Sequence, residues 1–194
     1  MTYEAQNFDN LLGTQGFSEQ LLKNHFTLYQ GYVTNTNKLL DTMMSLVKEG
    51  KTTTPEFAEL KRRFGWEFNG MRLHELYFGN MITNGKKIEE GPLKKALENS
   101  FGNWETWEKA FKAVGTMRGI GWVVLCYDPQ GKKFFNLWIN EHDLGHLTGT
   151  FPLLIMDVFE HAYMIDYGLK KADYIETFFK NLDWSIVENR FAQV

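Results

Sequence analysis

The sequence is short of several features, and each shortage excludes a class of protein. A single cysteine, Cys126, stands among 194 residues, so no disulfide forms within the chain, as is typical of a reducing compartment. No apolar run approaches the roughly 18 residues that a membrane-spanning helix needs. The first residues carry no basic segment followed by an apolar one. With a net charge of −3, neither a nucleic acid nor a membrane is an expected partner. We therefore expect a cytoplasmic globular protein.

The first half of the chain has a helical pattern. Apolar residues recur about every 3.6 positions between Ser18, which suits an N-cap, and Gly50, which suits a helix end. Thr54 followed by Pro55 predicts the start of a second long helix that runs toward Met81. Two long helices joined by a short loop predict a helical hairpin.

The second half changes character. Residues 122–127 and 134–139 are β-branched and aromatic runs, and Asp128-Pro129-Gln130-Gly131 between them suits a hairpin turn. A third strand is expected over residues 151–156. Shorter helices are expected at 92–99, 104–114, near Ala162 and over 172–190.

Three of the five histidines share a pattern with one carboxylate. His25 lies in the first predicted helix, His74 lies in the second, and Asp157 and His161 are four residues apart. Three imidazoles and one carboxylate form a nitrogen-and-oxygen site that suits iron, manganese or zinc. Each histidine taken singly is equally consistent with a packed or exposed imidazole that makes one hydrogen bond.

A second histidine pair competes with this set. His142 and His146 have the H-x-x-x-H spacing of a zinc hydrolase helix. Asp143 stands where the general-base glutamate belongs, and Gly145 makes the segment resemble a loop. A zinc-dependent hydrolase is therefore an alternative hypothesis.

The segment Asp157-Val158-Phe159-Glu160-His161-Ala162-Tyr163 resembles the metal-binding signature of the iron/manganese superoxide dismutases. Further motifs occur in the family's order along nearly the whole chain. They are Tyr32-Val33-Thr34-Asn35, Gly119-Ile120-Gly121-Trp122, Pro152-Leu153-Leu154, Asp166-Tyr167 and Asp183-Trp184. The signature together with this order identifies the chain as a member of that family.

The resemblance implies a site and a reaction. Carried over by position, His25, His74, Asp157 and His161 are the four metal ligands, with a water or hydroxide as the fifth. One iron or manganese ion per subunit converts superoxide to dioxygen and hydrogen peroxide. The expected function is that of an antioxidant oxidoreductase.

The family's outer hydrogen-bonding group is usually a glutamine, which comes either from the second helix or from the loop after the second strand. The helix position is Gly70 here, and His142 falls at the loop position. We therefore expect His142 to be the partner of the metal-bound solvent. His146 has no family role and is expected to be structural or exposed.

The first helix departs from the family, which commonly reads H-x-x-x-H-x-x-x-Y. Here His25 is followed by Tyr29 and Tyr32. A seven-residue spacing keeps Tyr32 within about 20° of the His25 face of a regular helix, whereas eight residues overshoot it by about 80°. We predict an unbulged helix in which Tyr32 is the gate tyrosine and Tyr29 is its partner, although either phenol could line the channel.

Other departures alter the surroundings of the metal. Phe159 replaces the signature tryptophan and Arg72 replaces an aromatic residue, so we expect a wetter wall around the metal, while Trp122 shields one side. Ile155 is bulkier than the glycine often seen in manganese members, which favours iron over manganese.

The resemblance also implies a subunit contact and a guiding cation. Glu160 and Tyr163 are implied to touch a second subunit, so a homodimer is expected and a tetramer is an alternative. Arg190 resembles an arginine near the channel mouth that guides superoxide.

The expected fold is α+β. An N-terminal α-helical hairpin domain (residues 1–88) precedes a C-terminal α/β domain (residues 89–194) with a three-stranded antiparallel sheet flanked by helices. The main hypothesis is superoxide dismutation, and a third hypothesis is a catalytically silent dimeric metal-binding protein with the same fold.

Overall fold

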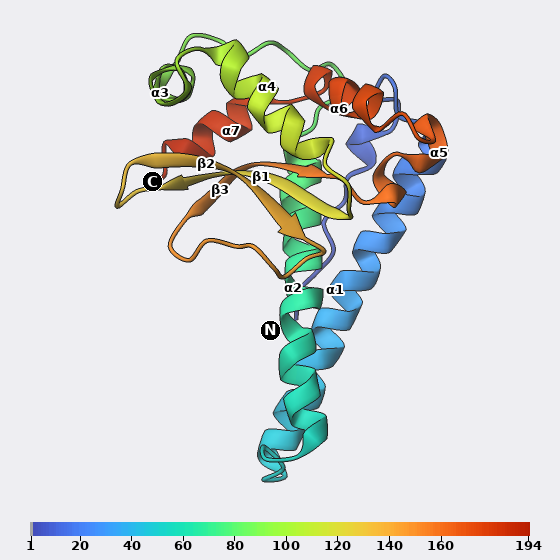
Figure 1. Ribbon diagram of the computed structural model, residues 1–194. Coiled ribbons are helices and arrows are strands. Elements are labelled where there is room, and N and C mark those ends of the chain that lie inside the picture. The colour runs from blue at the N-terminus through green and yellow to red at the C-terminus, as the bar shows by residue number, and fades with distance from the viewer. Residues whose placement is uncertain (1) are drawn as a thin grey trace.

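A computed structural model describes residues 2–194 and shows two long antiparallel helices in the N-terminal half (Figure 1). A short 3-10 turn, η1, at Asp9–Leu11 comes first. Helix α1 then spans Glu19–Lys48, and helix α2 spans Pro55–Gly79. The Ser18 side chain accepts a hydrogen bond from the Leu21 N–H, and the Thr54 side chain accepts one from Phe57. Both predicted N-caps are thus confirmed, because these hydroxyls satisfy N–H groups that have no partner within the helix.

The C-terminal half contains a three-stranded antiparallel sheet in the order β2-β1-β3. Strand β1 spans Gly121–Asp128, β2 spans Lys133–Asn140 and β3 spans Phe151–Asp157. Strand β1 is central and is buried over its first six residues, as its near-continuous apolar sequence requires. Its register pairs Trp122 with Asp157 on β3, so the last residue of β3 lies beside the second residue of β1.

Helices surround this sheet, and the expected α+β fold is confirmed. They are α3 (Pro92–Phe101), α4 (Trp104–Gly115), η2 (Glu160–Ala162), α5 (Met164–Tyr167), α6 (Lys171–Lys180) and α7 (Trp184–Phe191). The helical segment expected over 172–190 is interrupted. Leu182 forms a β-bridge with Met81, and the Asp183 N–H donates to the Asn80 carbonyl. These bonds to the residues that follow α2 replace helical hydrogen bonds and separate α6 from α7.

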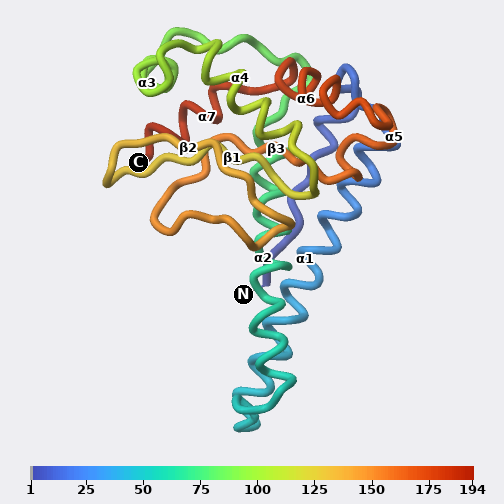
Figure 2. Tube along the Cα trace, viewed as in Figure 1, coloured from blue at the N-terminus to red at the C-terminus, as the bar shows by residue number. Residues whose placement is uncertain are grey.

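One hydrophobic core includes residues from both halves of the chain. Helix α2 packs against β3, helix α4 packs against β1 and β2, and the far end of the α1–α2 hairpin projects away from the sheet (Figure 2). The division into domains at residue 88 stays a prediction. Within residues 2–194, no helix is both long and apolar enough to cross a membrane.

Candidate metal centre

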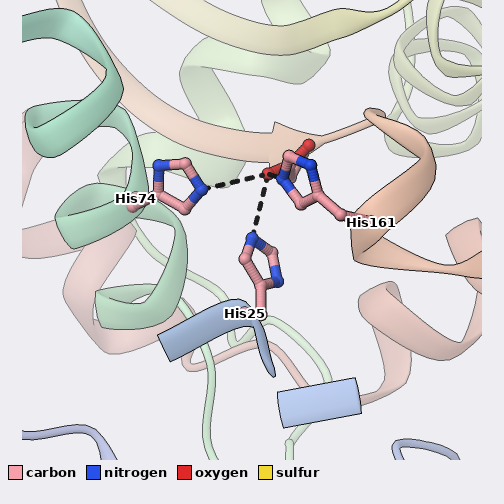
Figure 3. Close-up of side chains that lie close together, drawn as sticks. His25, His74 and His161 are labelled. Atoms are coloured by element: carbon pink, nitrogen blue, oxygen red, sulfur yellow. Dashed lines mark hydrogen bonds and ion pairs between the residues drawn. The ribbon is translucent and has the colours of Figure 1, made fainter. Parts of the chain in front are cut away.

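Four side chains from separate parts of the chain converge where the two halves meet. The Nε2 atoms of His25, His161 and His74 lie 3.1, 3.2 and 3.7 Å from Oδ2 of Asp157 (Figure 3). One ligand atom from each of the four residues lies within 4.8 Å of the others. The structure therefore brings together the three histidines and the aspartate that the sequence pattern singled out.

Local structure orients Asp157 toward the histidines. The Phe159 N–H donates a 2.8 Å hydrogen bond to Oδ1 of Asp157, and the Tyr174 hydroxyl donates a 2.6 Å bond to the Asp157 carbonyl. These two contacts hold the carboxylate at the end of β3. Because Oδ1 is occupied, Oδ2 is left to face the imidazoles.

The tautomer of His74 is decided by its own helix. Nδ1 of His74 lies 2.5 Å from the carbonyl oxygen of Gly70 one turn earlier. A carbonyl only accepts, so Nδ1 carries the proton and Nε2 has a bare lone pair. This Nε2 is buried without a hydrogen-bond partner and faces the Asp157 carboxylate. Two buried acceptors that face one another repel unless a cation lies between them, so these residues fit a metal ion.

The pKa values of these residues also favour a bound metal ion. Burial raises the pKa of Asp157, but the charges of His161 and His25 and their hydrogen bonds outweigh burial and hold that pKa well below its usual range. Burial lowers the pKa of His25, and burial with the nearby His25 charge lowers the pKa of His74 further. An ionised carboxylate at Asp157 and imidazoles with lowered pKa values at His25 and His74 favour metal binding, because a metal ion binds the deprotonated forms.

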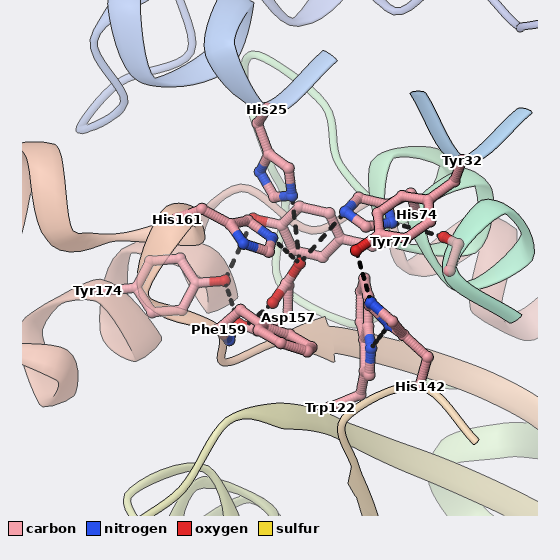
Figure 4. Close-up of polar contacts among 11 residues, drawn as sticks. His25, Tyr32, His74, Tyr77, Trp122, His142, Asp157, Phe159, His161 and Tyr174 are labelled. Atoms are coloured by element: carbon pink, nitrogen blue, oxygen red, sulfur yellow. Dashed lines mark hydrogen bonds and ion pairs between the residues drawn. The ribbon is translucent and has the colours of Figure 1, made fainter. Parts of the chain in front are cut away.

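A second hydrogen-bonded set lies beside the cluster (Figure 4). The indole N–H of Trp122 donates to Nδ1 of His142 at 3.0 Å, and Nε2 of His142 lies 2.7 Å from the Tyr32 hydroxyl oxygen. An indole only donates, so Nδ1 is the acceptor and Nε2 of the neutral ring carries the proton. Nε2 therefore donates to Tyr32, and the Tyr32 hydroxyl hydrogen stays available for another acceptor.

Comparison with known proteins decides the family. Residues 89–190 match the family model described as iron/manganese superoxide dismutases, C-terminal domain. The chain belongs to the iron/manganese superoxide dismutase family. An iron superoxide dismutase of Cupriavidus metallidurans is 37% identical over 183 residues, which cover 91% of this chain and 89% of the relative.

Relatives named for either metal resemble this chain to a similar degree. An iron superoxide dismutase of Aquifex pyrophilus is 34% identical, with 91% of this chain and 85% of the relative covered. A manganese superoxide dismutase of Haloarcula marismortui is 36% identical, with 86% and 81% covered. The family resemblance seen in the sequence is confirmed, and iron or manganese is supported as the metal.

Tyr29 is not the partner of Tyr32, contrary to our expectation. The Tyr29 hydroxyl donates to Oε1 of Glu75 at 3.0 Å and accepts the Gln6 N–H at 2.9 Å. Tyr32 instead bonds His142, and α1 is a continuous α-helix through both tyrosines. The spacing could not show this, because the groups that bind Tyr29 come from the N-terminal segment and from α2.

The Tyr32 ring packs directly against Gly70 of α2. A Cβ at Gly70 would lie 2.5 Å from Cδ1 of the Tyr32 ring and 2.7 Å from Cε1. The ring therefore occupies the space that a side chain from this helix position would fill. A glutamine at position 70 would therefore collide with the Tyr32 ring, so the glycine and the position of this ring depend on each other.

The His142 and His146 pair has no shared metal position. In His142, Nδ1 is bonded to Trp122 and Nε2 is bonded to Tyr32. In His146, Nε2 bonds the His142 backbone carbonyl at 2.9 Å. These nitrogens bond separate partners, and the segment is a turn rather than a helix. The zinc hydrolase hypothesis is therefore not favoured. His146 is exposed and holds this loop, as expected.

Two arginines behave differently from the sequence-based expectation. The Arg190 side chain is half-buried and donates to the carbonyls of Leu153 and Leu76, at 2.8 and 3.2 Å, and to Asn80. These hydrogen bonds join α7 to the end of α2 and to β3. Arg72 forms an ion pair with Glu75 and contributes to the α2 surface.

Phe159 and the η2 residues complete the surroundings. The Phe159 ring stacks on His142 and on His161, with centroid distances of 4.8 and 5.1 Å, and is 9% exposed. Phenylalanine therefore still covers the site where the family has tryptophan. Glu160 is exposed, whereas Tyr163 is buried and stacks on Tyr174 at 5.5 Å.

Sequence reasoning missed two groups at this site. Tyr174 bonds the Asp157 carbonyl, and no local pattern indicates such a contact across a helix and a strand. Trp66 packs edge-on against His142 at a centroid distance of 4.8 Å. Trp66, Gly70 and His74 are spaced by four residues on one face of α2, so a helical projection would have found Trp66.

We expect the metal-free protein to lose stability in acid partly through His142. Burial lowers the pKa of His142 to about 4, whereas the unfolded chain takes up this proton near pH 6.5. The unfolded state therefore binds more protons below pH 6.5, and the free energy of unfolding falls by up to about 3 kcal/mol between pH 6.5 and pH 4.

Urea unfolding of metal-free protein at several pH values measures this effect, with His142→Gln as the matched variant. His25 and His74 titrate in both proteins, so their contribution cancels in the difference. The variant should lose less stability over this range. Parallel pH curves for the two proteins would contradict the expectation.

Proposed function

We propose that this chain is a superoxide dismutase whose metal ligands are His25, His74, Asp157 and His161. The observation that carries the proposal is the buried Nε2 of His74, which has no hydrogen-bond partner and faces the Asp157 carboxylate at 3.7 Å. A bound iron or manganese ion would supply one-electron redox chemistry, taking an electron from one superoxide anion and giving one to another. Family membership and relatives named for either metal support the same reaction.

The residues of the chain must help to deliver protons, because two superoxide anions and two protons yield one dioxygen and one hydrogen peroxide. His142 donates its Nε2 hydrogen to Tyr32, so the Tyr32 hydroxyl can direct its own hydrogen to a substrate oxygen. Burial raises the pKa of Tyr32 to about 12, so this phenol keeps its proton at neutral pH. Trp122 holds His142 in the required tautomer. In this proposal Tyr32 is the proton-bearing gate, and His142 and Trp122 position it.

Three finer statements belong to the proposal. Iron is favoured over manganese, with one ion per subunit, because Ile155 occupies a position where manganese members often have glycine. A homodimer is favoured because Glu160 is exposed next to His161, whose side chain is 28% exposed. A cytoplasmic location rests on the single cysteine.

The test is superoxide dismutation by iron-loaded and by manganese-loaded protein, with Asp157→Ala as the control. Activity of either loaded form above the control supports the proposal. Equal rates for the loaded protein and the control would overturn it and would favour the silent metal-binding protein. One equivalent of bound zinc without a redox-active metal would also contradict it.

We expect His142→Gln to preserve the fold and the metal content while changing activity or metal preference. A glutamine amide can accept from Trp122 and donate to Tyr32, but its reach and acidity differ from those of imidazole. Rates with both metals across a pH series measure the effect. Unchanged rates and an unchanged pH profile with both metals would count against a role for His142.

A further inference from the structure

A continuous path of side chains leads from the Tyr32–His142 pair to solvent along α2. Trp66 packs edge-on against His142, and the Arg63 guanidinium carbon lies 4.9 Å from the centre of the Trp66 ring. The Arg63 side chain is 53% exposed. Its cationic group therefore lies at the outer end of a stack whose inner end is the hydroxyl of Tyr32.

Arg63 is held in this position by a buried carboxylate. Its Nη2 and Nε atoms lie 2.8 and 2.9 Å from Oε1 of Glu67, whose side chain is 5% exposed. Asn35 of α1 donates a further hydrogen bond to Oε2 of Glu67 at 3.3 Å. A two-point contact on a fixed carboxylate orders the guanidinium and keeps it over Trp66.

The two arginines that the sequence analysis singled out, Arg190 and Arg72, bind other groups of the protein. Arg190 donates hydrogen bonds to two carbonyl groups, and Arg72 pairs with Glu75 beside the ring of Tyr3. By contrast, the charge of Arg63 is felt at the site. Burial raises the pKa of Tyr32 and Arg63 offsets part of that rise, while burial lowers the pKa of His142 and Arg63 adds to that lowering. The whole chain carries a net charge of −3, so an anion needs a local attraction to approach it.

We propose that Arg63 draws the superoxide anion toward the Tyr32–His142 side of the metal centre. This role rests on the proposed function and replaces the one expected of Arg190. A half-exposed cation at the outer end of an apolar wall raises the local concentration of an anion and speeds its encounter with the site. The attraction acts through solvent and is therefore screened by salt.

The test compares variants that separate local charge from net charge. Arg63→Gln combined with Glu67→Gln leaves the net charge unchanged, avoids a buried unpaired carboxylate and removes the exposed cation. Arg63→Lys keeps the charge. Arg62→Gln is the matched control, since Arg62 is a neighbouring exposed arginine that pairs with Glu59. Pulse radiolysis gives kcat/KM between low and high ionic strength, and titration of the metal-loaded protein with azide gives an anion Kd.

We expect the double variant to have a kcat/KM about 3- to 10-fold below wild type at low ionic strength and a nearly flat salt dependence. Its azide Kd should rise by a similar factor. Arg63→Lys and Arg62→Gln should stay within about twofold of wild type. Metal content and Tm of each variant are first shown to equal those of wild type. If the double variant folds poorly, Arg63→Gln alone enters the same comparison.

The outcomes separate this inference from the proposed function. A double variant with the rate, salt dependence and azide Kd of wild type overturns the role of Arg63 while dismutation stands. Wild-type protein without turnover, but with azide binding weakened in the variant, contradicts dismutation and supports Arg63 as the residue that attracts anions. An equal loss in Arg62→Gln would overturn the local role, because the position of the cation over Trp66 would then make no difference.

Discussion

Asp157→Asn should abolish superoxide dismutation and lower the affinity for iron and manganese by more than about 100-fold. The carboxylate is fully buried and is the anion around which three imidazoles gather. Asparagine has the same shape and can still accept the Phe159 N–H, but it does not neutralise a cation. Metal content after loading and dialysis, together with the rate of dismutation, measures the effect.

The matched control for this variant is Asp173→Asn. Asp173 is exposed in the first turn of α6, so the same substitution should leave metal content and activity unchanged. Circular dichroism should show that the fold of Asp157→Asn is retained. A variant at Asp157 that keeps one equivalent of metal and its activity would contradict the assignment of this ligand.

Gly70→Ala should destabilise the protein by about 1–3 kcal/mol and reduce activity by roughly tenfold. The added Cβ would lie 2.5 Å from the Tyr32 ring, which is packed between α1 and α2. The ring must move, and its 2.7 Å hydrogen bond to His142 lengthens or breaks. This loss outweighs the roughly 1 kcal/mol by which alanine exceeds glycine in helix propensity.

Gly31→Ala separates packing from propensity. Gly31 lies in α1, and a Cβ there meets no atom within 4 Å. We expect this variant to be more stable by about 0.5–1 kcal/mol, with unchanged activity. Urea unfolding and rate measurements on both variants give the comparison. Stabilisation of Gly70→Ala with full activity would show that Tyr32 does not depend on this glycine.

Much of the secondary structure follows from short-range patterns. Ser18 and Thr54 cap the two long helices as predicted, because a hydroxyl at the N-cap satisfies N–H groups within three residues. The turn after residue 128 joins two strands whose aromatic and β-branched residues suit a sheet. The break between α6 and α7 was not predictable in this way, because the partners of residues 181–183 lie at the end of α2.

The site shows the same limit. The histidine and aspartate pattern and the family signature named a set of candidate ligands, but which hydroxyl contacts which ring was open. Tyr29 and Tyr32 are three residues apart on one helix, yet one bonds Glu75 and the other bonds His142. Their surroundings, not their own identity, decide this difference.

By itself, the sequence determined the two long helices, the strands, the donor types of the metal centre and the family. These properties depend on caps, periodicity and residue chemistry, which act over a few positions. Only the tertiary structure decided the tautomers of His74 and His142, the hydrogen-bond partners of Arg190 and the position of Arg63 over Trp66. Each of these depends on a carbonyl, an indole or a carboxylate that a fixed backbone geometry brings within hydrogen-bonding or van der Waals distance.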